Sequence, residues 1–151
     1  MRSVRDEEGE RYLLVKRSAE SSLVRDPETG AERYLSNADL TVEEATSPLT
    51  TATDAVPASV RRVLTATSTE RALGVLVELV DRGPLAVRTL LGDYDLCESD
   101  LHGLIAEFRA AGLVAETHVA GERGYEATEP ARDAVACLRA DAGTDRSAAD
   151  G

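Results

Sequence analysis

Few side chains of the 151-residue sequence have the type and spacing that a metal site or a catalytic site requires. The candidate metal ligands are Cys97, His102, His118 and Cys137. Cys97 and His102 are separated by four residues, which is not a usual zinc pairing, and the other two lie far from them in the sequence. We therefore interpret Cys97 as a small residue at a helix start and Cys137 as a small apolar residue, and we expect neither a metal nor another cofactor. A redox-sensing role is the alternative for Cys97, because a helix dipole lowers the pKa of a thiol at its N-terminus.

The sequence contains no motif of nucleophilic or nucleotide-dependent catalysis. The glycine-rich phosphate-binding motifs and the G-x-S-x-G elbow do not occur. Two acid pairs, Asp93 with Asp95 and Glu98 with Asp100, have the residue types for acid–base chemistry. Because acids abound throughout the chain, we interpret both pairs as solvated surface charge and predict that the protein is not an enzyme.

The charge balance is strongly acidic. The sequence has 28 Asp and Glu against 17 Lys and Arg, for a net charge of −11, and Lys16 is its single lysine. This composition is typical of extreme halophiles, whose surface carboxylates keep proteins hydrated in concentrated salt; an ordinary acidic protein from a GC-rich genome is the alternative. Negative charge opposes nucleic-acid binding, but molar salt shortens the Debye length to ~3 Å, so binding to DNA stays open.

Targeting signals are not found in the sequence. It has no apolar run long enough to span a membrane and no basic segment followed by an apolar stretch, as a signal peptide would have. Two cysteines do not make a secreted disulfide framework. We expect a cytoplasmic protein without a membrane partner.

The first 39 residues predict a small three-stranded antiparallel β-meander. Its strands are RYLLVKR (11–17), SSLVR (21–25) and ERYL (32–35), and DPETG (26–30) between the last two favours a hairpin turn. We expect residues 1–10 to be a frayed start. Lys16, Arg17 and Arg25 are candidates for an accessory nucleic-acid contact, and a solvated strand face is the alternative.

Residues 40–56, rich in Thr, Ser, Ala and Glu without sustained periodicity, predict a linker. A short helix is expected after Pro57. Thr67-Ser68-Thr69-Glu70 fits a capping box with Thr67 as the N-cap, and the helix that it begins ends at Gly83-Pro84. The apolar stripe of this helix is expected at Leu73, Leu76, Val77 and Val80.

The remaining pattern predicts a second small domain over residues 57–141. A weaker segment at 86–91 precedes a helix at Glu98–Ala111, whose core face carries Leu101, Leu104, Ile105 and Phe108. Two β-like runs then flank Ala120–Gly124, a last helix follows, and 142–151 is expected to be a disordered tail. Helices followed by a hairpin and a helix are the order of a winged helix-turn-helix, so we predict an α+β fold with this domain after the meander.

Two motifs support a family resemblance over residues 69–135. They are Arg109-Ala110-Ala111-Gly112-Leu113-Val114 at the end of the third helix of this stretch, Glu98–Ala111, and Tyr125-Glu126-Ala127-Thr128 returning from the wing, Ala120–Gly124. This stretch resembles the ArsR/MarR-type winged-helix transcription regulators. The whole chain, with its N-terminal hairpin, is similar to small haloarchaeal proteins of winged-helix type. The resemblance implies a homodimer that binds double-stranded DNA through the third helix and the wing. The last helix, with Ala131, Ala134, Val135 and Leu138, is our candidate for the dimer contact.

The outward face of the third helix has only small side chains, which is unusual for a helix that reads DNA. Its residues are Ser99, Gly103, Ala106 and Ala110, none of which offers a bidentate contact to a base. We predict DNA contacts from five residues, Arg88, Ser99, His102, Arg109 and Arg123. The alternative is a protein–protein interaction adaptor, in which the small residues pack closely against a protein partner instead of DNA.

Overall fold

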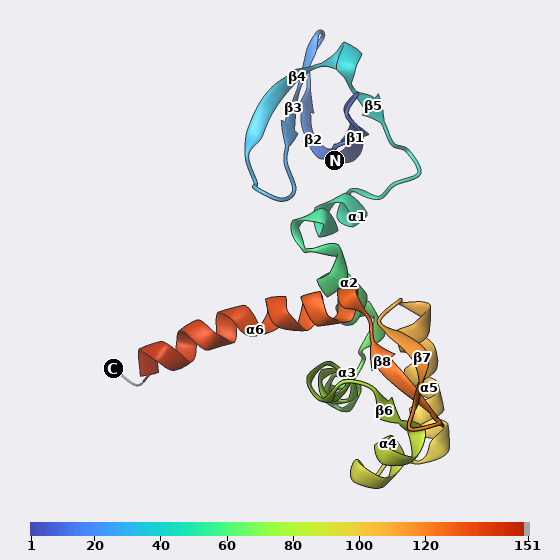
Figure 1. The fold of residues 1–151 in the computed structure, drawn as a ribbon. Helices are drawn as coiled ribbons and strands as arrows, with labels where there is room; N and C mark the ends of the chain where they lie inside the picture. The colour runs from blue at the N-terminus through green and yellow to red at the C-terminus, as the bar shows by residue number, and fades with distance from the viewer. Residues whose placement is uncertain (150–151) are drawn as a thin grey trace. The chain divides into compact units, whose positions relative to one another are not determined.

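The protein is described by a computed structural model that covers the backbone of residues 1–149 and the side chains of residues 1–140. The chain forms two compact units, which divide between Pro57 and Ala58 (Figure 1). The first unit is mainly β-sheet, and the second combines helices with a small antiparallel sheet.

The first unit is built on a five-stranded antiparallel sheet in the order β4-β3-β2-β1-β5. The strands are β1 (Arg2–Arg5), β2 (Arg11–Arg17), β3 (Ser21–Arg25), β4 (Glu32–Ser36) and β5 (Thr41–Val42). β2, β3 and β4 form the predicted meander. The expectation of a frayed start was wrong, because Arg2–Arg5 pairs with β2 and buries Ser3 and Val4 on opposite faces. Tertiary pairing fixes this strand, which is too short to show an alternating pattern.

The expected linker at 40–56 is also ordered structure. β5 pairs with β1, a 3-10 turn spans Asn37–Asp39, and α1 (Pro48–Ala52) and a second 3-10 turn (Thr53–Ala55) follow. Ser47 caps α1 by accepting from the Leu49 amide, and Pro48 occupies its first turn. Ser3 and Thr51, both buried, share a hydrogen bond of 2.7 Å between their hydroxyls. Single contacts of this kind hold the segment in place, which is why no periodicity revealed it.

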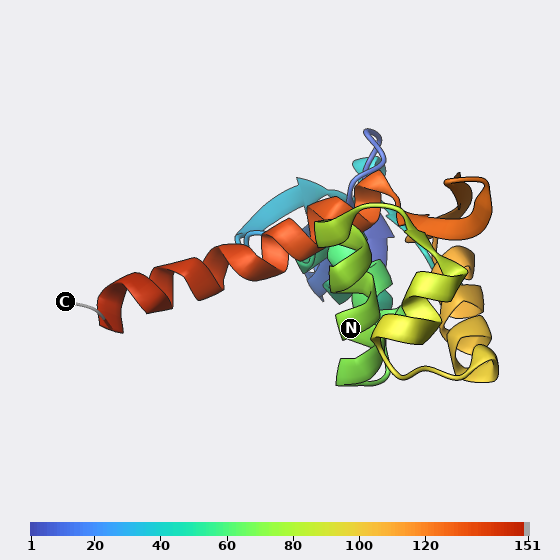
Figure 2. The same cartoon turned by 60° about the horizontal axis from the view of Figure 1, so that its bottom comes forward.

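The second unit has the topology of a winged helix-turn-helix. Its elements are α2 (Ala58–Ala66), α3 (Glu70–Arg82), β6 (Leu85–Ala86), α4 (Val87–Asp93), α5 (Glu98–Ala110), β7 (Val114–Val119), β8 (Glu122–Ala127) and α6 (Glu129–Ala149). The three strands form an antiparallel sheet in the order β6-β8-β7, and the β7–β8 hairpin is the wing. The wing lies beside α5 (Figures 1 and 2). The predicted α+β class and winged-helix fold are confirmed.

The start of α3 differs from the predicted capping box. Thr69 is the N-cap, and its hydroxyl accepts from the Ala72 amide at 3.1 Å. Thr67 instead donates its hydroxyl to the Val63 carbonyl in the last turn of α2. Two threonines two residues apart can both serve as a cap, and the end of α2 decides between them.

The core of the second unit is aliphatic around one phenylalanine. Phe108 is fully buried, as are Leu76, Leu79, Leu90 and Leu113. The most buried face of α3 carries Ala72, Val75, Leu76 and Leu79, so the expected stripe was wrong except at Leu76. Because alanine is small, Ala72 lets another element pack closely on this face. The prediction used only the large apolar residues of the helix and therefore missed it.

The wing is anchored at its base and tight at its tip. Ala120 (φ 52°) and Gly121 (φ 81°) both have positive φ, as a two-residue type I′ turn requires, so β8 starts earlier than predicted. At the base, β6 pairs with β8, and a Cβ on Gly124 would lie 2.5 Å from the Leu85 carbonyl oxygen. Glycine is therefore required at position 124 by close approach.

The last helix is longer than expected. α6 continues to Ala149, whereas the sequence predicts a helix that ends at Ala140 and a disordered tail over 142–151. Residues 150 and 151 lie outside the described part of the chain. The helix begins by packing on α2 and α3, and its later turns extend past the body of the second unit (Figures 1 and 2).

Candidate nucleic-acid interface

Helix α5 buries one face and presents the other to solvent. Leu101, Ile105 and Phe108 are buried, whereas the predicted small face is exposed along its whole length. That face consists of Ser99, Gly103, Ala106 and Ala110. The helix is thus held from behind by apolar packing, and its outer surface is free to meet a partner.

Cys97 begins this helix as its N-cap. Its Sγ accepts from the Asp100 amide at 3.4 Å and lies 3.1 Å from the Ser99 Oγ. This agrees with its interpretation as a helix-start residue. Cys137 is exposed on α6. Within the described residues, no group of three or more His, Cys, Asp or Glu is arranged to hold a metal ion.

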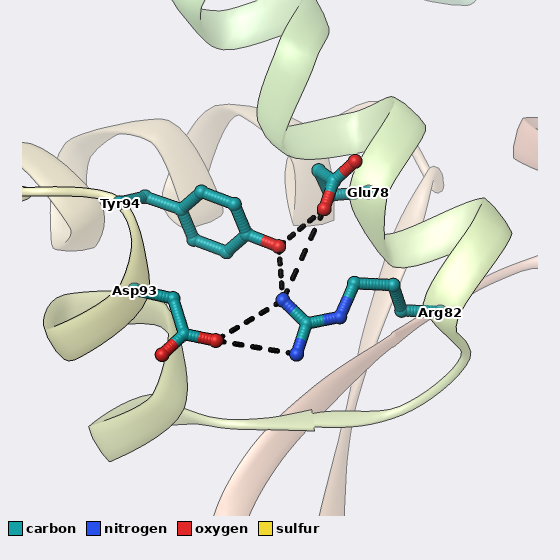
Figure 3. Close-up of polar contacts among 4 residues, drawn as sticks. All are labelled: Glu78, Arg82, Asp93 and Tyr94. Carbon is teal, nitrogen blue, oxygen red and sulfur yellow. Dashed lines mark hydrogen bonds and ion pairs between the residues drawn. The ribbon is translucent and has the colours of Figure 1, made fainter.

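A polar cluster fixes the turn that leads into α5 (Figure 3). The Tyr94 hydroxyl donates to the Glu78 carboxylate and accepts from Arg82, whose two terminal nitrogens also lie 3.2 Å from Asp93 Oδ2. The pKa of Tyr94 is raised mainly by its hydrogen bond to Glu78 and to a lesser extent by desolvation. The pKa of Arg82 is raised by its hydrogen bonds to Tyr94 and Asp93. Because Glu78 and Arg82 belong to α3, this cluster ties α3 to the end of α4.

Sequence reasoning missed this cluster. The spacing of Glu78 and Arg82, four residues apart on one helix face, was the available signal. Their partners Asp93 and Tyr94 come from the next helix and its turn, and only the helix-turn-helix geometry brings them within reach.

Three of the five predicted contact residues lie together. His102 and Arg109 of α5 and Arg123 of the wing line a hollow of about 60 Å³, together with Ile105, Ala106 and Tyr125. His102 and Arg123 also line a larger hollow of about 230 Å³ that reaches toward Val87 and Leu91 of α4. Arg88 and Ser99 are exposed and line neither hollow. The geometry joins the middle of α5 to the wing.

The arginines of this surface are all paired with carboxylates. Glu116 of β7 lies 3.3 Å from Arg123 and 3.6 Å from Arg109, and Glu122 lies 3.4 Å from Arg88. Arg123 also lies over the Tyr125 ring, 5.7 Å from its centroid. About half or more of each arginine side chain is exposed to solvent. Ion pairs exposed to this degree contribute little, typically ~0.2–1 kcal/mol, so a phosphate can replace the carboxylate.

The first turn of α5 is acidic. Glu98 and Asp100 lie at the positive end of the helix dipole, which they stabilise, and Arg71 lies 3.5 Å from Asp100. Ser99 is exposed between these two acids. Carboxylates at this position repel phosphate, so DNA contacts are better placed from His102 toward the C-terminal end of the helix.

The arrangement defines the class of the protein: it contains a winged helix-turn-helix domain in which helix α5 and the wing each present an exposed surface. Residues 1–139 match the model of a family of unknown function, DUF7346, and the chain belongs to that family. No curated protein matches the chain.

Two solved structures are similar to part of the chain. HlyU from Vibrio cholerae N16961 is 28% identical, with 54% of this chain and 89% of that chain covered and a TM-score of 0.46. The transcriptional regulator HlyU from Vibrio vulnificus CMCP6 is 26% identical, with 58% of this chain and 91% of that chain covered and a TM-score of 0.47. No helix of the described residues has the length and apolar character to cross a membrane.

Proposed function

We propose that the protein is a DNA-binding transcription regulator of the ArsR/MarR winged-helix type. The observation that supports this most is the exposed outer face of α5, directly beside a wing that carries Arg123. The major groove of B-form DNA admits a helix, and a wing normally follows the phosphate backbone. A surface of this shape is suited to a duplex.

In this proposal each of the five predicted residues has a role. His102 and Arg109 of α5 contact bases or phosphates in the major groove, and Ser99, which lies between two acids, contacts a base. Arg123 contacts a phosphate or the minor groove, and Arg88 of α4 contacts the backbone. Arg109 and Arg123 exchange Glu116 for phosphate on binding, and Arg88 exchanges Glu122. The small residues of α5 let its backbone approach the base edges closely.

The test is the affinity of the full-length protein for DNA from upstream of its own gene. Fluorescence anisotropy in molar KCl is expected to show that the double variant Arg109→Ala/Arg123→Ala binds at least tenfold more weakly, since each lost charged contact costs about 1 kcal/mol or more. Arg5→Ala/Arg11→Ala is the control of equal charge, because these arginines pair with Glu43 and Asp54 in the first unit. Equal binding by the double variant and the wild type would show that Arg109 and Arg123 are not part of the DNA-binding surface.

A protein–protein interaction adaptor is the second candidate. It is favoured by the carboxylates that neutralise Arg88, Arg109 and Arg123, and by the small face of α5, which a protein helix could approach closely. Affinity capture in high salt then recovers a protein partner, and chromatin immunoprecipitation shows no enriched DNA. Enriched promoter fragments decide for the regulator.

We also propose that the regulator is a homodimer. Ala131, Ala134 and Val135 of α6 are buried within the unit, so they belong to its own core. Leu138 of α6 and Leu64 of α2 remain 43% and 60% exposed, on two helices that pack together. Light scattering is expected to show a dimer for the wild type and a monomer for Leu64→Glu/Leu138→Glu. A wild-type monomer at micromolar concentration contradicts the proposal.

The acidic composition supports a haloarchaeal setting for this function. A net charge of −11 suits a cell with concentrated internal salt, where repulsion between the protein and DNA is screened. A regulator that binds chromosomal DNA in such a cell works in the cytoplasm.

A further inference from the structure

Two cations of the first unit, Lys16 and Arg25, differ in their surroundings from the arginines beside α5 and the wing. In the second unit, six arginines pair with carboxylates: Arg71, Arg82, Arg88, Arg109, Arg123 and Arg139. In the first unit, and among the side chains that the structure describes, Lys16 and Arg25 have no carboxylate within 4.0 Å. Cations without an ion-pair partner can bind an external anion without first giving up an internal one.

A β-bulge turns Lys16 toward the side of the sheet that carries Arg25. Leu14 pairs with Val24, but Lys16 pairs with Leu23, so one extra residue lies between the two pairs on β2. In a regular strand, Leu14 and Lys16 would point to the same face. The bulge reverses this, and Lys16 lies on the opposite face to Leu14.

The same face carries the chain's most exposed aromatic side chain. Leu23 pairs with Lys16 on one side and with Tyr34 on the other, so these three residues form a row across β2, β3 and β4. Arg25 lies two residues from Leu23 and shares their face. Tyr34 is 64% exposed, whereas Tyr12, Tyr125 and Phe108 are buried.

The uncovered part of this face lies over the end of β2 and over β3 and β4. Toward β1, the face is closed by α1, where Ser3 is bonded to Thr51 and Leu13 is buried. We name the open part, Lys16, Leu23, Arg25 and Tyr34, the Tyr34 face. It spans three strands, which is roughly 9–10 Å and enough for one or two nucleotides.

We propose that the Tyr34 face binds single-stranded nucleic acid. An unpaired base stacks on the Tyr34 ring with Leu23 beside it, and the phosphates on either side contact Lys16 and Arg25. Stacking on an aromatic ring is tolerant of sequence, and it resists the salt that screens phosphate contacts. An acidic protein partner would use the same cations, but it would not require an aromatic ring at position 34.

This site is separate from α5 and does not depend on the proposed regulator function. Glu32 lies opposite Arg25 in the register of β3 and β4, without an ion pair between them, so it shares this face and repels phosphate. It therefore provides a variant that is expected to strengthen binding instead of weakening it.

The test uses the full-length protein and a labelled thymidine oligonucleotide of about 12 nucleotides in anisotropy titrations. Tyr34→Ala is expected to bind about tenfold more weakly, and Tyr34→Phe is expected to bind as the wild type does, because it keeps the ring. Lys16→Gln and Arg25→Gln should each lower the salt dependence of the affinity by about 0.7 in the log–log slope. Glu32→Gln should bind more tightly.

Matched controls separate this site from the winged-helix surface. The double variant Arg109→Ala/Arg123→Ala should bind the oligonucleotide as tightly as the wild type. A loss in that variant assigns the binding to α5 and overturns the proposal. Equal binding by Tyr34→Ala and Tyr34→Phe also overturns it. So does competition by polyglutamate for the labelled oligonucleotide that is as strong as competition by unlabelled oligonucleotide, because this result indicates an acidic protein partner. Circular dichroism verifies that each variant is folded.

Discussion

At the scale of single residues, Glu116 controls the positive charge that the wing can offer. It pairs with both Arg109 and Arg123, so in the proposed regulator it would compete with phosphate for both. We expect Glu116→Gln to bind duplex DNA about fivefold more tightly, which corresponds to about 1 kcal/mol, because exposed ion pairs are worth at most about that much. Anisotropy titrations measure the change, with Glu126→Gln on β8 as a control of equal charge. Tighter binding by both variants to the same extent would point to net charge alone.

Gly124 is the residue on which the base of the wing depends. An added Cβ would lie 2.5 Å from the Leu85 carbonyl oxygen, a backbone atom that cannot move without breaking the β6–β8 pairing. We expect Gly124→Ala to lower the free energy of unfolding by roughly 1–3 kcal/mol in urea denaturation. Gly74→Ala on α3 is the matched control, since nothing lies within 4 Å of its Cβ, and it should stabilise the protein by about 0.5–1 kcal/mol. Similar effects of both substitutions would contradict the close approach.

At the scale of elements, Tyr94 connects α3 to the end of α4. Tyr94→Phe removes both of its hydroxyl contacts, with Glu78 and with Arg82, so we expect its melting temperature to fall by a few degrees. Because α5 follows this turn, DNA affinity should fall as well. A variant with unchanged melting temperature and unchanged affinity would show that apolar packing alone sets the helix positions.

The same tyrosine predicts a dependence of stability on alkaline pH. Its pKa is raised in the folded state by the hydrogen bond to Glu78 first, so the folded protein holds this proton more tightly than the unfolded chain. The contribution is fully present below the unfolded pKa of about 10 and is lost as the pH rises through the folded value. Tyr12 shifts in the same direction through burial and its bond to Asp6. The difference between the pH profiles of the wild type and Tyr94→Phe isolates Tyr94, and identical profiles would contradict the shift.

At the scale of the whole molecule, negative charge sets the response to salt. The net charge of −11 makes the folded chain repel itself at low ionic strength. We expect the melting temperature to rise from about 0.1 M to about 1 M KCl, over which the Debye length falls from ~10 Å to ~3 Å. A calorimetric series in KCl, with sucrose as an uncharged control, measures this. A melting temperature that is constant in KCl would contradict the proposed haloarchaeal setting.

The winged-helix domain could be predicted because its signals are local. Gly83-Pro84, the core face of α5 and the hairpin around Gly121 each depend on neighbouring residues in the sequence. β1, β5 and α1 were missed because long-range contacts such as Ser3 with Thr51 hold them. The candidate site shows the same division. The sequence indicated Arg109 and Arg123, but the partner they share, Glu116, depends on the strand register.

The wing is held at its base, where Gly124 lies against Leu85 and β8 pairs with β6, and its tip at Ala120 and Gly121 is exposed. Residues inserted in pairs at the free end would lengthen both strands and keep their alternation, and each pair would add roughly 3.3 Å of reach. Related proteins could therefore differ in the length of the β7–β8 hairpin while the β6–β8 pairing at its base and the helices stay unchanged.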